Sequence, residues 1–395
     1  MATLQRITLF APAGNLATSD YLFVYVNALY PLRDAFRALG VQAEVCLVPL
    51  NGADLKAYLA KEKPDAILDI NRSRAQIDGL PDDVLHIAWV QDPRNFDNTM
   101  VHQGFGGSDQ VYFFLPPQVF GFDPDGAAVK GWRYLTPGVD EAVFFPRAAE
   151  AESDFAFIGY LPMMMPDRLR NRRISDGAKS FTLGEIEREL SERDIRTSNT
   201  GHAALKRFMV DFIRSKLDRP VISAEDFDGL LRIFEDGVLR ITERRAMLEA
   251  ALEVSSSLRI FGPRSWEHWP QFAPLHRGLL TLPEDLAAVY RTTRVGLHNG
   301  ALNMHFRTME AMACGLPLLM VPTPHDATPG GILSHFTEGQ DFRMVTPDTV
   351  GEAARALLAD EDARRAMGAS ASAKVLAGHT WGHRARQILD DVAGA

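Results

Sequence analysis

The chain has 395 residues, of which 46% are hydrophobic and 24% charged, a balance typical of a globular protein with two domains of ordinary size. The formal net charge of −9 argues against a protein whose main role is to coat nucleic acid. The N-terminal segment lacks the apolar core of a secretory signal, and no stretch approaches about 18 uninterrupted apolar residues. We therefore expect a soluble, cytoplasmic protein.

The sequence holds two cysteines, Cys46 and Cys314, which are too few for a disulfide framework or a cysteine-based metal cluster. A small buried thiol explains Cys314 better than a nucleophile does, because cysteine is commonly a core residue. The chain also has eleven histidines, and no C-x-x-C array accompanies them. No metal site is therefore predicted.

Short apolar runs alternate with helical patterns over the first part of the chain. The expected strands cover residues 7–11, 41–49, 66–70, 85–90, 111–115 and 132–135, and the expected helices cover about 21–39 and 56–62. This alternation indicates parallel βαβ units and a doubly wound sheet with helices on both faces. We predict a Rossmann-like N-terminal domain over residues 1–148.

A connection between domains is expected at residues 136–147, which contain two prolines and a glycine. Further strands are expected at 155–159, 258–261, 293–297 and 316–321, and further helices at 306–313, 350–375 and 379–393. Residues 166–254 are rich in Arg and Glu and longer than a βα crossover needs. We interpret them as a helical insertion, either an acceptor-recognition or oligomer surface or a solvated pad that only extends the fold.

The segment 297–322 combines a strand end, a polar glycine-containing loop, a helix start and a second strand. Arg307 and Glu310 lie three residues apart in the first turns of the expected helix, so both side chains should lie on one face. Ligands of open α/β sheets bind outside the carboxyl ends of the strands, and the positive end of the following helix suits a phosphate. The loop before Glu310 is therefore where we expect a nucleotide.

The run RTMEAMACGLPLLM resembles the nucleotide-sugar site of GT-B glycosyltransferases, and MHFRTMEAMACG is similar to the CgeB-like (spore-maturation-protein-like) branch with its R-x-x-E-x-x-x-C-G pattern. Other segments, among them DFAFIGYL and EDLAAVYRTTRVGLHNG, resemble that family in the expected order over roughly two-thirds of the chain. The resemblance implies an α/β fold of two Rossmann-like domains facing a central cleft. The second domain would span 149–378, and a last helix at 379–395 would cross back to the first.

The implied activity is that of a glycosyltransferase of the hexosyltransferase type. It would move a sugar from a nucleoside-diphosphate sugar to a hydroxyl of a glycan, lipid-linked or protein acceptor, with no metal or other cofactor. Two alternatives stay open: a GT-B-like nucleotide-sugar epimerase, and a non-catalytic sugar-binding or assembly protein whose insertion is the working surface. A membrane surface and a second copy of the chain are further expected partners, and nucleic acid is not.

Sugar transfer requires that the ribose is held, the leaving diphosphate is stabilised and the acceptor hydroxyl is deprotonated. By resemblance Glu310 holds the ribose, since two vicinal hydroxyls can donate to one carboxylate; the alternative is a helix acid stabilised by the dipole. Arg307 is the first choice for the diphosphate, with an ion pair to Glu310 as the alternative. Asn303 and His305, with the residue between them, are expected to supply backbone amides at the start of the helix.

Other groups at strand ends are expected to face the same cleft. Gly159 and Gly262 end the first two strands of the second domain, and Gly14 after the first strand of the chain allows close approach of a ligand. Arg264 is a further candidate for the phosphate. Trp266 either stacks on the base or caps an edge of the core.

The catalytic base is expected from the first domain, where the acceptor enters. The candidates are Asp92, at a strand end, and Asp20, in the loop after the first strand, although an Asp before a proline is often a turn or helix cap. His298 is the histidine candidate in the second domain. Many retaining GT-B enzymes carry a first Glu eight residues before the second, where Leu302 stands here; the CgeB-like branch generally lacks this acid, so the stereochemistry is not predicted.

Overall fold

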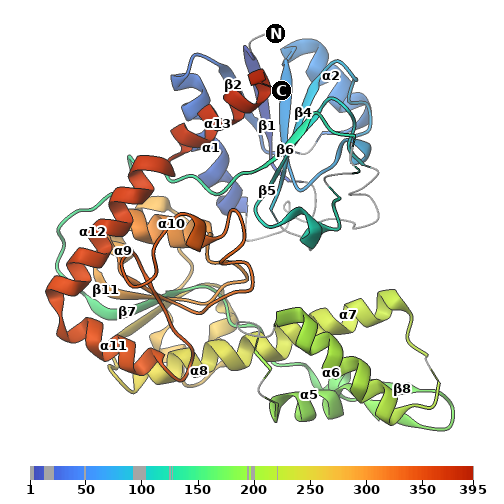
Figure 1. Cartoon of the computed structure of the whole chain (residues 1–395), viewed down its shortest axis with the longest axis vertical. Coiled ribbons are helices and arrows are strands. Elements are labelled where there is room, and N and C mark those ends of the chain that lie inside the picture. Colours follow the sequence, from blue (N-terminus) through green and yellow to red (C-terminus); the bar gives the residue numbers. More distant parts are fainter. Residues whose placement is uncertain are drawn as a thin grey trace.

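The computed structural model describes residues 4–12, 22–48, 50–91, 104–123, 126, 128–193, 195–196, 201–219 and 221–394. Two α/β domains lie next to each other, and a largely helical subdomain projects from the second domain (Figure 1). None of the helices in the described part of the chain is long and apolar enough to cross a bilayer.

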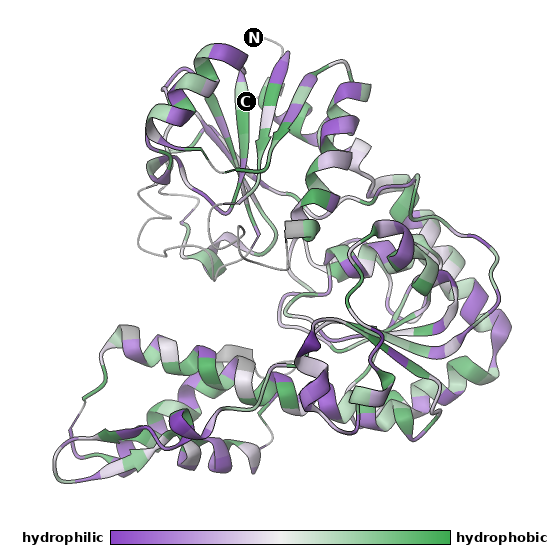
Figure 2. Ribbon diagram, turned by 180° about the vertical axis from the view of Figure 1, so that it is seen from behind, coloured by the Kyte–Doolittle hydropathy of each residue, from purple (hydrophilic) through white to green (hydrophobic). Residues whose placement is uncertain are grey.

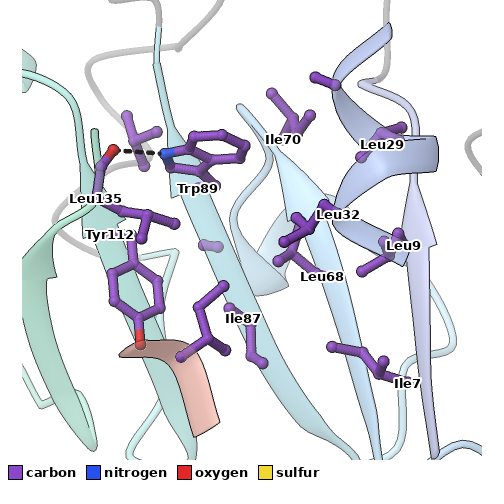
Figure 3. Packing of buried hydrophobic residues seen from close by; sticks show 14 of the residues in the cluster. Ile7, Leu9, Leu29, Leu32, Leu68, Ile70, Ile87, Trp89, Tyr112 and Leu135 are labelled. Carbon is purple, nitrogen blue, oxygen red and sulfur yellow. Dashed lines mark hydrogen bonds between the residues drawn. The ribbon is translucent and has the colours of Figure 1, made fainter. Parts of the chain in front are cut away.

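The first domain is built on a six-stranded parallel sheet in the order β2-β1-β3-β4-β5-β6. Its strands are β1 (Arg6–Phe10), β2 (Gln42–Cys46), β3 (Ala66–Ile70), β4 (Leu85–Val90), β5 (Asp109–Phe113) and β6 (Gly131–Tyr134), with helices α1 (Leu22–Ala38) and α2 (Gly52–Glu62). β3 is buried along its whole length, as in a parallel sheet covered on both faces. Figure 3 shows the core beside it, where the Nε1 of Trp89 donates a hydrogen bond to the carbonyl of Leu135 at 3.0 Å.

The second domain has a five-stranded parallel sheet in the order β10-β7-β11-β12-β13. Its strands are β7 (Ser153–Ile158), β10 (Leu258–Phe261), β11 (Thr293–His298), β12 (Leu318–Met320) and β13 (Arg343–Met344), and its helices are α8 (Arg240–Leu252), α9 (Pro283–Arg291), α10 (Phe306–Ala313), α11 (Val350–Ala359) and α12 (Glu361–Gly378). In this order the direction of winding reverses between β7 and β11, which is where such sheets bind ligands. The predicted α/β fold with two Rossmann-like domains is confirmed.

The insertion differs from its predicted extent of 166–254. Its own core is built from residues 165–239, on α4 (Asp167–Arg170), α5 (Leu183–Ser191), α6 (Gly201–Lys216), α7 (Ala224–Phe234) and a π-turn, η5 (Glu235–Leu239). Hydrophobic and hydrophilic residues alternate along these helices (Figure 2). It also contains a hairpin of β8 (Arg173–Ser175) and β9 (Ser180–Thr182), which the sequence does not predict. α8 instead packs Met247 and Leu248 into the core of the second domain, so it is the first helix after the insertion.

Two crossings of the chain between the domains lie side by side. Val139 forms a parallel bridge with Thr380, and α13 (Trp381–Gly394) packs against α1 with Trp381 in the core of the first domain. The buried Arg384 donates from Nε to the carbonyl of Thr136 at 2.8 Å. At Gly138 a Cβ atom would lie 2.6 Å from the Trp381 ring, so only glycine lets the two crossings approach this closely.

We therefore expect Gly138→Ala to destabilise the protein by about 1–3 kcal/mol, because the added methyl group overlaps the indole and the Cα of Trp381. The measurement is the free energy of unfolding in urea. Gly229→Ala in α7 is the control, since a Cβ there meets no atom within 4 Å and should leave the stability unchanged or higher. Equal stabilities of Gly138→Ala and wild type would show that the crossing tolerates a side chain.

Candidate active site

Helix α10 begins at the carboxyl edge of the second sheet, near the ends of β7 and β11. We call the place between these two strands, where the direction of winding reverses, the switch point. The N-cap of α10 is His305, whose Nδ1 accepts a hydrogen bond from the amide of Arg307 at 3.4 Å. The loop 299–305 joins this cap to the end of β11. The positive end of α10 is therefore directed at the place where a parallel sheet of this order binds its ligand.

Arg307 extends from α10 toward the ends of β7 and β11. It lines a cavity of about 20 Å³ with Ile158 and His298, and its Nη1 would lie 3.7 Å from a Cβ atom at Gly159. Its Nε is buried and has no hydrogen-bond partner among the described residues. A buried donor without an acceptor costs about 1–3 kcal/mol, which a bound anion would offset.

Glu310 faces a different cavity, of about 180 Å³, at the junction of the domains. Asn27 and Tyr30 of α1, Pro283 at the start of α9 and Trp381 also line it. The sequence predicts Arg307 and Glu310 on one face of the helix, but their side chains line two different cavities. No ion pair joins these two side chains, both of which are described, so the intrahelical pair weighed as the alternative does not form.

The ionisation of Glu310 is set by its surroundings. Burial raises the pKa of Glu310 to about 7, and the charge of Arg307 lowers it in part. Tyr290 of α9 lies close by and donates its hydroxyl hydrogen to the carbonyl of Arg307 at 3.1 Å. A carboxylate in such a cavity gains from ligand hydroxyls that replace the lost water.

Two neutral histidines flank the cationic group. Burial, with the charges of Arg307 and Arg244, lowers the pKa of His298 to about 3, and its Nε2 lies 3.5 Å from the hydroxyl of Thr308. The same causes lower the pKa of His305 well below its usual range. At neutral pH both imidazoles are uncharged, so they can form hydrogen bonds with a ligand but add no positive charge.

Asn303 holds the loop in place. The side chain is fully buried, and its Nδ2 donates to the carbonyl of Val321 and to Oδ2 of Asp326, both at 3.0 Å. The amide of His305 donates to the carbonyl of Asn303 at 2.9 Å. Asn303 therefore holds the loop against the segment after β12. The amide of His305 already donates within a turn, so it is not available to a ligand.

Of the other predicted site residues after β7 and β10, the two glycines and Trp266 are packed inside the protein, and Arg264 is exposed to solvent. Gly262 lies against Gly159, since a Cβ at 262 would come within 1.9 Å of the Gly159 carbonyl oxygen. Trp266 is fully buried and donates from Nε1 to that carbonyl at 2.9 Å, which is the core role considered for it rather than the stacking role. Arg264 is exposed and forms no hydrogen bond or ion pair with any described residue, so it is free to meet a ligand.

Asp92, Asp20 and Gly14 lie outside the described residues. Among the residues described, no group of three or more His, Cys, Asp or Glu side chains is placed to hold a metal ion.

The sequence does not predict the role of Phe306, the first residue of α10. Its ring lies 6.3 Å from that of Trp89 at the end of β4, 5.7 Å from Phe114 and 6.1 Å from Trp381. These three rings belong to the core of the first domain. An aromatic residue within the polar HNGALNMHFR segment is the one signal that could have indicated this contact.

Comparison with known proteins supports the fold and finds a family similarity over part of the chain. A family model described as "Glycosyl transferase-like" matches residues 241–390. No curated protein matches the sequence. Among solved structures, HepE from Anabaena in complex with UDP-glucose matches with a TM-score of 0.50 and 11% identity, over 99% of this chain and 100% of HepE.

Two further structures are less similar in shape. Sucrose-phosphate synthase from Thermosynechococcus elongatus has a TM-score of 0.49 and 15% identity over 97% of each chain. WaaG, a glycosyltransferase involved in lipopolysaccharide biosynthesis, has a TM-score of 0.44 and 13% identity over 99% of this chain and 100% of its own. The HepE match extends over both domains, and the fold of this chain is GT-B.

The raised pKa of Glu310 predicts a dependence of stability on pH. Because its folded pKa of about 7 lies above the usual 4.5, ionisation opposes folding, and stability falls as pH rises through that window. Without ligand, Glu310→Gln should therefore be more stable than wild type by about 1–3 kcal/mol at pH 8, with a smaller gain at pH 5.5. Thermal unfolding at both pH values tests this, with exposed Glu352→Gln as control. A gain independent of pH would contradict the assigned ionisation.

Proposed function

We propose that the protein is a glycosyltransferase that transfers a sugar from a nucleoside-diphosphate sugar to a hydroxyl acceptor, as a member of the CgeB-like branch. The observation that carries the proposal is the start of α10, where Arg307, whose buried Nε has no partner among the described residues, lines one cavity and Glu310 lines another. The R-x-x-E-x-x-x-C-G pattern lies within the matched residues 241–390. The presence of UDP-glucose in HepE supports a donor of this class.

In this proposal the donor lies across the first turns of α10. The diphosphate takes the positive end of the helix and Arg307, whose fork of N–H donors matches phosphate oxygens. The ribose lies toward Glu310, and its two vicinal hydroxyls donate to the carboxylate. The cavity between α1 and Pro283 receives the nucleoside side of the donor.

The leaving group carries the negative charge that develops during transfer. The acceptor oxygen bonds to the anomeric carbon as the bond from that carbon to the diphosphate breaks, and the diphosphate leaves with the electron pair. Arg307 and the helix amides stabilise this charge without a metal ion. The acceptor proton passes to a base of the first domain, for which Asp92 and Asp20 are the candidates, while the neutral His298 hydrogen-bonds to the donor.

Ligand-dependent stability identifies the nucleotide. We expect one of UDP, GDP and dTDP to raise the midpoint of thermal unfolding of the wild type, since a ligand that binds only the folded state stabilises it. Glu310→Ala and Arg307→Gln should each weaken this binding about tenfold or more. Exposed Glu352→Ala and Arg343→Gln are the controls and should bind as wild type does. If both Glu310→Ala and Arg307→Gln bound the nucleotide with wild-type affinity, the proposal would be wrong.

Turnover separates the proposal from its two alternatives. Incubation with the sugar form of the preferred nucleotide should release the nucleoside diphosphate, by slow hydrolysis alone and faster with an acceptor glycan. An epimerase would interconvert the sugar of the donor without release. A non-catalytic binding protein would bind the donor and leave it unchanged.

A further inference from the structure

Helix α8 directs three charged side chains toward the carboxyl edge of the second sheet. Arg240, Glu243 and Arg244 are spaced at i, i+3 and i+4, so they lie on one face of the helix. All three are buried, with 8%, 3% and 3% of their surface exposed. Because α8 continues directly from η5, this face also marks the base of the inserted subdomain.

Arg244 connects the segments that follow β7 and β11, the two strands between which the winding of the sheet reverses. Its Nη2 donates to the carbonyl of Asn299 at 2.7 Å and its Nε to Oδ1 of Asn299 at 3.2 Å, while Nη1 donates to the carbonyl of Tyr160. Asn299 in turn donates from Nδ2 to Glu243 at 3.2 Å. Tyr160 follows β7 and Asn299 follows β11, so one guanidinium holds both strand ends.

The contact with Asn299 bears directly on the loop that leads to α10. Asn299 is the first residue of the loop 299–305, and Asn303 fixes the same loop near its other end. This loop sets the position of the His305 cap and, through it, of Arg307. Arg244 lines neither the Glu310 cavity nor the Arg307 cavity, so it would act on the site through this loop, which positions Arg307. Its influence should therefore concern the diphosphate side of the site rather than the nucleoside side.

We propose that Arg244 is a positioning residue for the diphosphate, which it serves by tying the loop 299–305 to the base of the inserted subdomain. The inference rests on the proposed function in that the ligand is a nucleoside diphosphate. In this role Arg244 acts through its contacts with the loop, without binding the diphosphate itself. If Arg244 only stabilised the fold, its substitution would weaken the binding of the diphosphate and of the nucleoside equally.

The test compares a nucleoside diphosphate with its own nucleoside. The probe is whichever of UDP, GDP and dTDP binds the wild type, measured beside uridine, guanosine or thymidine by calorimetry. Arg244→Gln should weaken the diphosphate about tenfold or more and leave the nucleoside within about twofold, because a displaced loop misplaces Arg307. Arg244→Lys, which keeps the charge but not the fork, should give an intermediate loss.

Arg245→Gln is the matched control, because Arg245 is the next residue of the same helix and pairs with Glu249 at 3.2 Å with 41% of its side chain exposed. It should change neither affinity. Asn299→Ala is a milder second variant that removes one acceptor of Arg244 and keeps the carbonyl contact. It should reproduce the selective loss to a smaller extent.

Hydrogen exchange provides a readout that does not require a ligand. Amides of residues 299–305 should exchange faster in Arg244→Gln than in wild type or Arg245→Gln. Unchanged exchange there, or equal loss of affinity for diphosphate and nucleoside, would overturn the inference. If Glu310→Ala weakens binding while Arg244→Gln does not, this inference alone fails. If the wild type binds no nucleoside diphosphate, the proposed function fails with it.

Discussion

The packing of Phe306 against Trp89, Phe114 and Trp381 is the contact on which the arrangement of the site depends. It packs the first residue of α10 against the core of the first domain, so the start of this second-domain helix contacts both domains. Aromatic pairs of this kind contribute about 0.5–1.5 kcal/mol each beyond their buried area. The position of α10 therefore depends on the packing of both domains.

Given that fixed helix start, the charges around it follow from burial. The Nε of Arg307 has no partner among the described residues, the flanking histidines are neutral, and burial raises the pKa of Glu310 to about 7 in a separate cavity. A single helical turn thus offers a cation to one half of a ligand and a hydrogen-bond acceptor to the other. An anion that also carries hydroxyl groups matches both.

The sequence predicts the elements with strong local signals and misses the side-chain directions. α10 and β4 have the predicted bounds, because the apolar runs are clear and Gly315 ends the helix. The spacing of Arg307 and Glu310 places them on one helical face, but periodicity does not specify rotamers, and their side chains enter different cavities. The sequence likewise places residues 240–252 in the insertion, because composition does not show which charged side chains are buried. The Arg- and Glu-rich composition of this segment suggests a solvated face, whereas backbone carbonyls of distant loops satisfy Arg244 inside the protein.

The inserted subdomain leaves and rejoins the second domain at neighbouring points. The Nη1 of Arg240, at the return, donates to the hydroxyl of Tyr160, at the exit, so the two ends of the excursion meet. A unit with adjoining ends and a separate core can be shortened, enlarged or replaced without shifting the register of either flanking strand. Another domain could therefore be inserted at this position, beside the proposed ligand site, with the second domain otherwise unchanged.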